Sequence, residues 1–322
     1  MTISKTPLVN YIIRRVALFP LVIFSVVTIN FLLIHLSPGG PFSVLLSNPT
    51  ISPHDVKLLE AQYGLNKPLY EQYFIYIYQI LRGNFGISYF YGVPVIKVIL
   101  TYLPNTLELA GFSIILSSFL GISLGTIAAM RRKFTDKALN VVGMVSYTTP
   151  VFFVGIIMIL VFSVYLKILP PTGVYVSSGF NPIEYVRHII MPVISLSIFL
   201  FPPVYFFARS NIIQTMGMDY IKALRSKGIK EKLIFYRHAL HNALLPVVTL
   251  IGLQSTILFG GAVIVEVVFT WPGIGFMTYT AILQKDYPLL LGSIFFFALL
   301  VAALNLLVDI VYIKIDPRVV LK

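Results

Sequence analysis

Three carboxylates interrupt long apolar stretches of the sequence and are the first candidates for chemistry: Glu108, Glu266 and Asp309. A charge at the centre of a bilayer costs about 3 kcal/mol on insertion scales, so an ionisable side chain in an apolar stretch is a functional candidate. Glu108 and Asp309 stand near the ends of their stretches, where they would reach water. Glu266 precedes a Trp-Pro-Gly turn, where it either holds the turn or faces a transport pathway.

Other polar side chains in apolar stretches can be explained by hydrogen bonds between helices. Asn105, Gln254 and Asn305 are of the type that hydrogen-bonds between transmembrane helices, with pore lining as the second interpretation. We take Glu266, Gln254, Asn105 and Glu108 as the pathway or gate candidates.

Catalytic, metal and nucleotide sites find no support in the sequence. There is no cysteine, and no Gly-rich phosphate loop ending in Gly-Lys-Ser or Gly-Lys-Thr. The five histidines show no metal-ligand spacing within apolar stretches; they are His35, His54, His188, His238 and His241. We therefore predict no catalytic residue, no metal site and no cofactor in this chain.

The composition identifies the elements that must position these residues. Of 322 residues, 57% are hydrophobic and 11% charged, with a mean hydropathy of +0.89. A soluble domain carries roughly 25% charged residues, so this chain lacks the polar surface to remain in water. The formal charge of +12 would suit nucleic acid, but in so apolar a chain it serves to orient the protein in a bilayer. We predict an all-α integral protein of the cell (plasma or inner) membrane that passes through it several times, with no nucleic-acid partner.

Six stretches are long enough to cross the hydrocarbon, which takes roughly 20 apolar residues. They are about Val16 to Leu36, Leu107 to Met130, Val141 to Leu166, Ile189 to Ala208, Pro246 to Phe269 and Pro288 to Ile313. The first follows two arginines, as a signal peptide would, but its length and the lack of a small-residue cleavage site favour a retained helix.

The distribution of basic residues orients these spans. With the N-terminus inside, the inside segments hold 17 of the 24 lysines and arginines and the outside segments hold 7. The positive-inside rule therefore places both termini in the cytoplasm. The chain divides into residues 1–36, an extracytoplasmic loop at 37–104 and a core at 105–322 that includes a cytoplasmic segment at 209–245.

The outside loop contains two expected helices. Residues 53–63 form one, capped by Ser52 and ended by Gly64. Residues 70–81 form an amphipathic second helix that carries four tyrosines. These tyrosines either form an interfacial belt at headgroup level or a docking or gating surface at the outer mouth.

The inside segment is expected to form a helix, a break and a second helix. The first helix starts at Asp219, which would cap it or stabilise its dipole, and Gly228 ends it in a left-handed conformation. The second would run from Ile229 to Asn242, before Pro246 enters the fifth span. Ile221, Ala223 and Leu224 give the first helix an apolar patch that a partner protein or the lipid surface would cover.

The residues from Asp219 to Gly228, followed by those from Arg237 to Pro246, resemble the cytoplasmic coupling signature of ABC import permeases of the dipeptide, oligopeptide and nickel family. Three further stretches are similar to signatures of that family's first permease. They are Gly83 to Ser88 with Pro94-Val95, Glu266 to Gly275 with Asp286-Tyr287-Pro288, and Tyr312 to Arg318. The general coupling pattern begins Glu-Ala-Ala, whereas this chain has Lys222, Ala223 and Leu224 there.

The resemblance implies a type I ABC importer permease fold and a pore-forming subunit of an ATP-driven importer for peptides or similar solutes. It implies four kinds of partner: a second homologous permease, two cytoplasmic ABC ATPases that bind the ATP and Mg, an extracytoplasmic solute-binding protein, and the bilayer. The ATPase-coupling residues would be Asp219, Tyr220, Ala223, Leu224, Lys227 and Gly228. The alternative function is an ion-coupled secondary transporter, which would be expected to show inverted repeats and broken helices at the midplane.

Overall fold

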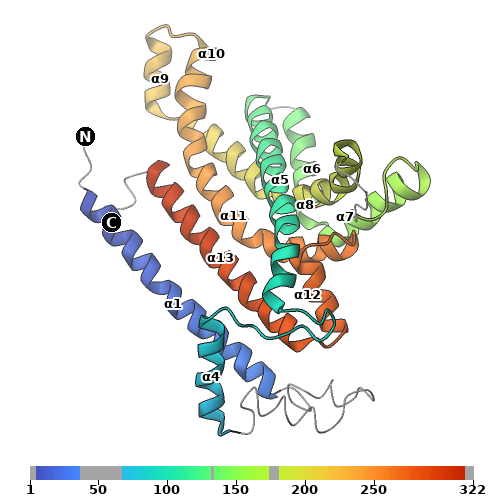
Figure 1. Cartoon of the computed structure of the whole chain (residues 1–322). Coiled ribbons are helices and arrows are strands. Elements are labelled where there is room, and N and C mark those ends of the chain that lie inside the picture. Colours follow the sequence, from blue (N-terminus) through green and yellow to red (C-terminus); the bar gives the residue numbers. More distant parts are fainter. Residues whose placement is uncertain (1–4, 37–66, 132–133, 174–180, 316–322) are drawn as a thin grey trace. The chain divides into compact units, whose positions relative to one another are not determined.

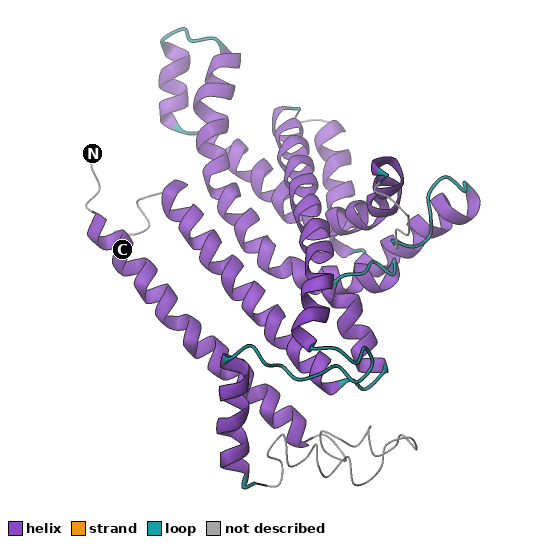
Figure 2. Cartoon of the chain, viewed as in Figure 1, coloured by secondary structure: helices purple, strands orange, loops and turns teal. Residues whose placement is uncertain are grey.

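The computed structural model describes residues 5–36, 67–131, 134–173 and 181–315 (Figure 1). Figure 2 shows this part of the chain as helices joined by loops, and its β pairing is limited to one isolated bridge between Ile87 and Pro94. The helices are α1 (Lys5–Leu36), α4 (Leu69–Leu81), α5 (Val95–Met130), α6 (Phe134–Thr148), α7 (Val151–Met158), η1 (Ile159–Tyr165), α8 (Pro182–Met216), α9 (Asp219–Ser226), α10 (Glu231–Leu233), η2 (Ile234–Ala239), α11 (Leu240–Val268), α12 (Ile274–Leu283) and α13 (Tyr287–Ile315). The all-α expectation is confirmed.

Four described helices are long and apolar enough to cross a membrane: Val95–Met130, Pro182–Met216, Glu231–Val268 and Tyr287–Val308. A fifth span results if the bent pair α6 and α7–η1 counts as one, and α1 adds a shorter apolar stretch, Phe19–Leu33. The count of six and the cytoplasmic position of both termini stay predictions. The expected helix at 53–63 lies outside the described residues.

The third expected span, Val141 to Leu166, contains Pro150 and is divided there into two helices. The chain bends by 102° between Phe134–Thr148 and Val151–Tyr165. Pro150 is the N-cap of α7, and a proline disfavours helical geometry in the residue before it. The Val145 carbonyl accepts both the Thr149 N–H at 3.0 Å and the Thr149 hydroxyl at 2.6 Å. A threonine hydroxyl bonded back to the i−4 carbonyl favours a bend, and this one stands directly before Pro150.

The fifth span also begins earlier than expected. Pro246 lies inside α11 instead of opening it, and α10, η2 and α11 follow one another without a loop from Glu231 to Val268. The second helix of the inside segment and the fifth span are therefore one element of 38 residues.

The chain forms two compact units. The first comprises residues 1–9, 105–276 and 304–322, and the second comprises 10–104 and 277–303. In the first unit α8 is the central helix, because α6, α7 and α11 all pack against it. Its span is the most buried of the four. A Cβ at Gly125 of α5 would meet the Tyr205 carbonyl of α8 at 2.8 Å, so these two helices approach each other at backbone distance.

A partly buried ion pair joins α6 to α8 in the same unit. The Arg209 guanidinium donates through Nε to Asp136 Oδ1 and through Nη2 to Asp136 Oδ2, both at 2.6 Å. Asn140 Nδ2 donates to Asp136 Oδ1 as well, at 2.7 Å. Because a bidentate arginine–carboxylate pair fixes orientation as well as distance, it sets the angle between the two helices.

In the second unit, α1 packs against α4 and α13. The buried Asn30 donates to the Leu291 carbonyl of α13 at 3.0 Å. The Tyr73 hydroxyl of α4 shares a hydrogen bond with Thr28 at 2.6 Å, and the rings of Tyr73 and Phe31 lie edge to face. Tyr70 and Tyr78 remain exposed. Some of these tyrosines therefore pack on α1, and others face outward. The exposed ones can still form either the interfacial belt or the docking surface expected from the sequence.

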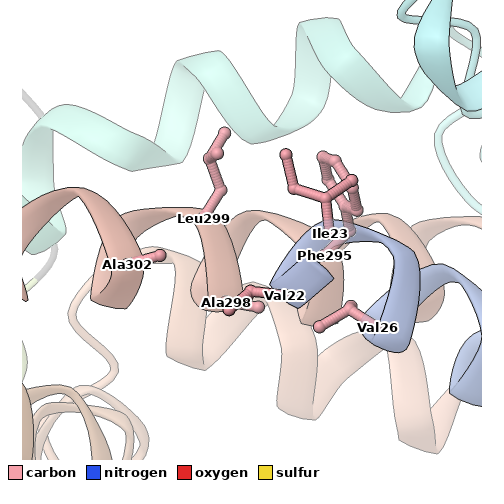
Figure 3. Close-up of a pocket in the computed structure, with 7 residues that line it drawn as sticks. All are labelled: Val22, Ile23, Val26, Phe295, Ala298, Leu299 and Ala302. Atoms are coloured by element: carbon pink, nitrogen blue, oxygen red, sulfur yellow. The ribbon is translucent and has the colours of Figure 1, made fainter. Parts of the chain in front are cut away.

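An apolar groove runs between α1 and α13 in this unit (Figure 3). Every lining side chain is apolar: Val22, Ile23, Val26, Phe295, Ala298, Leu299 and Ala302. Such a lining suits acyl chains or another apolar helix better than an aqueous solute.

Candidate functional site

The predicted coupling segment folds into a helical hairpin at the end of α11 (Figure 1). Gly228 has φ +73°, its N–H donates to the Arg225 carbonyl at 2.9 Å, and the Ile229 N–H donates to the Leu224 carbonyl at 3.3 Å. These two bonds and the left-handed glycine make a Schellman motif, which satisfies the last carbonyls of α9 and reverses the chain. The predicted role of Gly228 as a helix stop is confirmed.

Asp219 acts on the helix start by charge. The N-cap residue is Met218, with no side-chain capping bond, and Asp219 lies in the first turn, where a carboxylate favours the positive end of the helix dipole. Its Oδ1 also accepts a hydrogen bond from Lys222 at 2.8 Å. Of the two roles that the sequence left open for Asp219, the structure supports dipole stabilisation.

The apolar face of α9 is covered by the chain itself. Ile221 is fully buried against Ile234 and Ala239, and Leu224 and Ile229 pack around this cluster. The expectation that a partner or the lipid surface must cover this face is therefore wrong. The sequence pattern showed an apolar face without showing that η2 folds back onto it.

Polar contacts complete the hairpin. Arg225 on α9 donates through Nε to Glu231 Oε1 at 2.6 Å, across the turn at Gly228. The hydrogen bond to Glu231 is the largest cause of a raised Arg225 pKa. The Tyr220 hydroxyl donates to the His238 carbonyl at 3.4 Å and accepts from Asn242 Nδ2 at 3.3 Å. The hairpin is thus stabilised by the Arg225–Glu231 pair at its tip, the apolar cluster around Ile221 in its middle and the Tyr220 bonds at its base.

The predicted coupling residues differ in exposure. Leu224 is half-buried in the hairpin core, and the other five side chains or backbones are exposed: Asp219, Tyr220, Ala223, Lys227 and Gly228. The exposed group forms the surface that any partner of the hairpin would meet.

Glu266, the first pathway candidate, is engaged at the turn between α11 and α12. The side chain is fully buried. Its Oε1 accepts from the Thr106 hydroxyl at 2.8 Å and its Oε2 accepts from the Phe276 N–H at 3.1 Å. Thr106 accepts in turn from the Ile274 N–H at 2.7 Å. The carboxylate therefore lies at the N-terminus of α12, where the helix dipole favours negative charge. This geometry supports the turn-holding alternative.

Asn105 belongs to the same turn. Its Nδ2 donates to the Pro272 carbonyl at 2.7 Å, and its own carbonyl accepts from Trp271 Nε1 at 2.9 Å. A Cβ on Gly273 would overlap the Glu266 carboxylate, so glycine is required there by close approach. Trp271 and Pro272 are thus bonded to the start of the second expected span, and Gly273 lies against Glu266.

The remaining intramembrane candidates are not gathered into one site. Glu108 is exposed and accepts from the Tyr185 hydroxyl at 2.5 Å. Gln254 is half-buried in α11. Asn305 accepts from the Thr256 hydroxyl at 2.9 Å, an interhelical bond of the expected kind. The side chain of Asp309 lies outside the described residues. A transport role for Glu108, Gln254 and Asn105 stays a prediction.

A second buried carboxylate, Asp286, was missed as a site residue. Its Oδ1 accepts from the Leu289 N–H at 3.2 Å and so caps α13. Its Oδ2 accepts from the Ser88 hydroxyl at 2.5 Å and from the Phe90 N–H at 3.1 Å. The Asp-Tyr-Pro order announces a helix start, but the pairing with Ser88, 198 positions away, has no local sequence signal.

Comparison with known proteins places this architecture in a family. Residues 121–321 match the model of the binding-protein-dependent transport system inner membrane component, and residues 8–110 match the N-terminal model of such membrane components. An oligopeptide transport system permease protein of Bacillus subtilis (strain 168) is 35% identical, with 96% of this chain and 98% of the relative covered. A dipeptide transport system permease protein of Lactococcus lactis subsp. cremoris is 35% identical over 97% and 99%. Its counterpart from Escherichia coli (strain K12) is 32% identical over 97% and 99%. With both models matched in order, the chain belongs to the family of inner membrane components of binding-protein-dependent transport systems.

Proposed function

We propose that this chain is a pore-forming subunit of an ATP-driven importer of di- or oligopeptides. Membership of the family makes it a multi-pass permease component of the inner membrane with the type I importer fold. The peptide cargo is proposed because the full-length relatives are named as oligopeptide and dipeptide permeases. The proposed partners are a second homologous permease, two cytoplasmic ATPases that bind ATP and Mg, and an extracytoplasmic solute-binding protein.

One observation carries the coupling part of this proposal, namely the hairpin of α9 and α10 at the end of α11. Its apolar face is covered internally, and its turn is fixed by the Schellman motif at Gly228. A preorganised hairpin at the end of a spanning helix can transmit a push or a pull from a cytoplasmic ATPase without first folding. In this mechanism the hairpin docks on the ATPase and α11 carries the displacement into the membrane.

The ion-coupled alternative finds less support in the described residues. An ion-coupled carrier uses intramembrane carboxylates that bind and release cations. Glu266, the buried candidate for that role, has both oxygens engaged with Thr106 and the N-terminus of α12.

The test is to tag this chain, extract it in mild detergent from its native membrane and identify the co-purifying proteins by mass spectrometry. The proposal expects a second permease of similar size and ATPases with Walker motifs, and peptide uptake by the reconstituted complex that requires ATP. Recovery of an active protein alone, with uptake driven by an ion gradient, would contradict it.

A further inference from the structure

The hairpin presents an excess of positive charge that its own acids do not neutralise. Between Met218 and His238 there are six basic side chains and two acidic ones. Both acids are paired within the hairpin, Asp219 with Lys222 at 2.8 Å and Glu231 with Arg225 at 2.6 Å. Four cations of this segment then have no acidic partner among the described residues: Lys227, Lys230, Lys232 and Arg237. All four side chains are exposed.

Three of these cations lie around the turn and the first residues of the returning helix, and Arg237 lies farther along it in η2. Lys227 and Lys230 flank Gly228 and Ile229, and Lys232 lies within α10. Ile221 and Ile234 are buried in the hairpin core, whereas Leu233 of α10 remains exposed. A partner at the tip of the hairpin therefore meets the exposed lysines together with the Leu233 side chain.

The lipid surface lies slightly more than one screening length from this tip. The 38 residues from Glu231 to Val268 form a rod about 55 Å long at about 1.5 Å per residue. The hydrocarbon takes up about 30 Å of it and each headgroup layer about 5–7 Å. With a tilt of about 20°, the start of the rod then stands about 10 Å beyond the inner headgroups. Screening acts over about 8 Å at physiological ionic strength, so the attraction of anionic lipids is already weakened there.

We propose that the hairpin docks on an acidic protein surface, and that the unpaired cations Lys227, Lys230, Lys232 and Arg237 select that surface by charge. This inference rests on the proposed function, because the partner at that position is the importer's ATPase. The groove that receives the hairpin then carries carboxylates on its rim opposite these four residues. Charge complementarity of this kind mainly accelerates association and excludes wrong partners.

The experiment measures binding of the purified ATPase to the permease pair held in nanodiscs of zwitterionic lipid, at NaCl concentrations from low to high. For the native protein the dissociation constant should rise with salt, because charges at a solvent-exposed rim are screened. The triple variant Lys227→Glu, Lys230→Glu, Lys232→Glu should raise the low-salt dissociation constant about tenfold or more, and the gap should narrow at high salt.

A matched pair of single variants distinguishes a charge effect of the hairpin from an effect of the protein's total charge. Lys230→Glu should weaken binding about threefold. Lys137→Glu makes the same charge change at an exposed position on α6, outside the hairpin, and should leave binding unchanged. Circular dichroism and gel filtration of each variant confirm that the permease pair is intact.

The outcomes distinguish this inference from the proposed function. If no ATPase binds the native pair under any condition, the proposed function itself fails. If the ATPase binds but neither salt nor charge reversal changes its affinity, the acidic surface is refuted and the function stands. If charge reversal matters only in nanodiscs that contain anionic lipid, the cations serve the membrane and the inference is overturned.

Discussion

A substitution series at Gly228 isolates the backbone reversal from every other property of the coupling hairpin. The glycine has φ +73°, and a Cβ built on it would have no atom within 4 Å. A side chain there meets open space, so its cost within this chain comes only from the left-handed backbone. Alanine should cost about 1 kcal/mol and a β-branched residue more, whereas asparagine visits this region readily. About 1 kcal/mol shifts the ratio of formed to unformed turn about fivefold.

The coupling ratio at position 228 should therefore be highest with glycine or asparagine, lower with alanine and lowest with valine. The assay is the number of peptides taken up per ATP hydrolysed by the reconstituted importer, with membrane insertion checked separately. ATP hydrolysis should persist in Gly228→Val while uptake falls, since the nucleotide sites lie on other polypeptides in the proposed importer.

Gly83 provides a matched control. It has φ +75° and equally open surroundings, but it lies in the segment that follows α4. Gly83→Ala should carry the same backbone cost and leave the coupling ratio unchanged. Normal coupling in Gly228→Val would refute the argument that the turn must be left-handed. If Gly228→Asn fails as badly as Gly228→Val, the position is limited by contact with a partner and not by backbone conformation.

Three further predictions concern the buried polar contacts. Glu266→Ala leaves the buried Thr106 hydroxyl and Phe276 N–H without their acceptor, at about 1–3 kcal/mol each, and should lower the melting temperature in detergent more than Glu266→Gln does. Asp136→Ala removes the carboxylate partner of the half-buried Arg209 and should destabilise the protein by about 1.5–3 kcal/mol, and the double variant with Arg209→Met should recover part of that loss in the same melting assay. Asp286→Asn keeps one oxygen acceptor, so the amides at the start of α13 should exchange their hydrogens more slowly in this variant than in Asp286→Ala.

The sequence predicts the parts of this fold that follow from local chemistry. Apolar length gave the helices at the second, fourth, fifth and sixth expected spans, and Gly228 was expected to end a helix. The sequence did not predict which distant residues pair with each other. Asp136 with Arg209 and Ser88 with Asp286 join positions that only the folded chain brings together. Their residue types suggest polar contacts but carry no information on which partner each one takes.

Proline shows why local signals were insufficient even within single helices. Pro150 separates α6 from α7, whereas Pro246 lies within α11. The hydroxyls of the two threonines before Pro150 donate to the i−4 carbonyls of Met144 and Val145. Such bonds weaken a helix and favour a bend, in addition to the effect of the proline itself. The residues before Pro246 are Ala243, Leu244 and Leu245, which offer no such bond. A straight helix there leaves fewer carbonyls without a partner than a break would. The side chains that precede a proline therefore help to decide whether a membrane helix can stop.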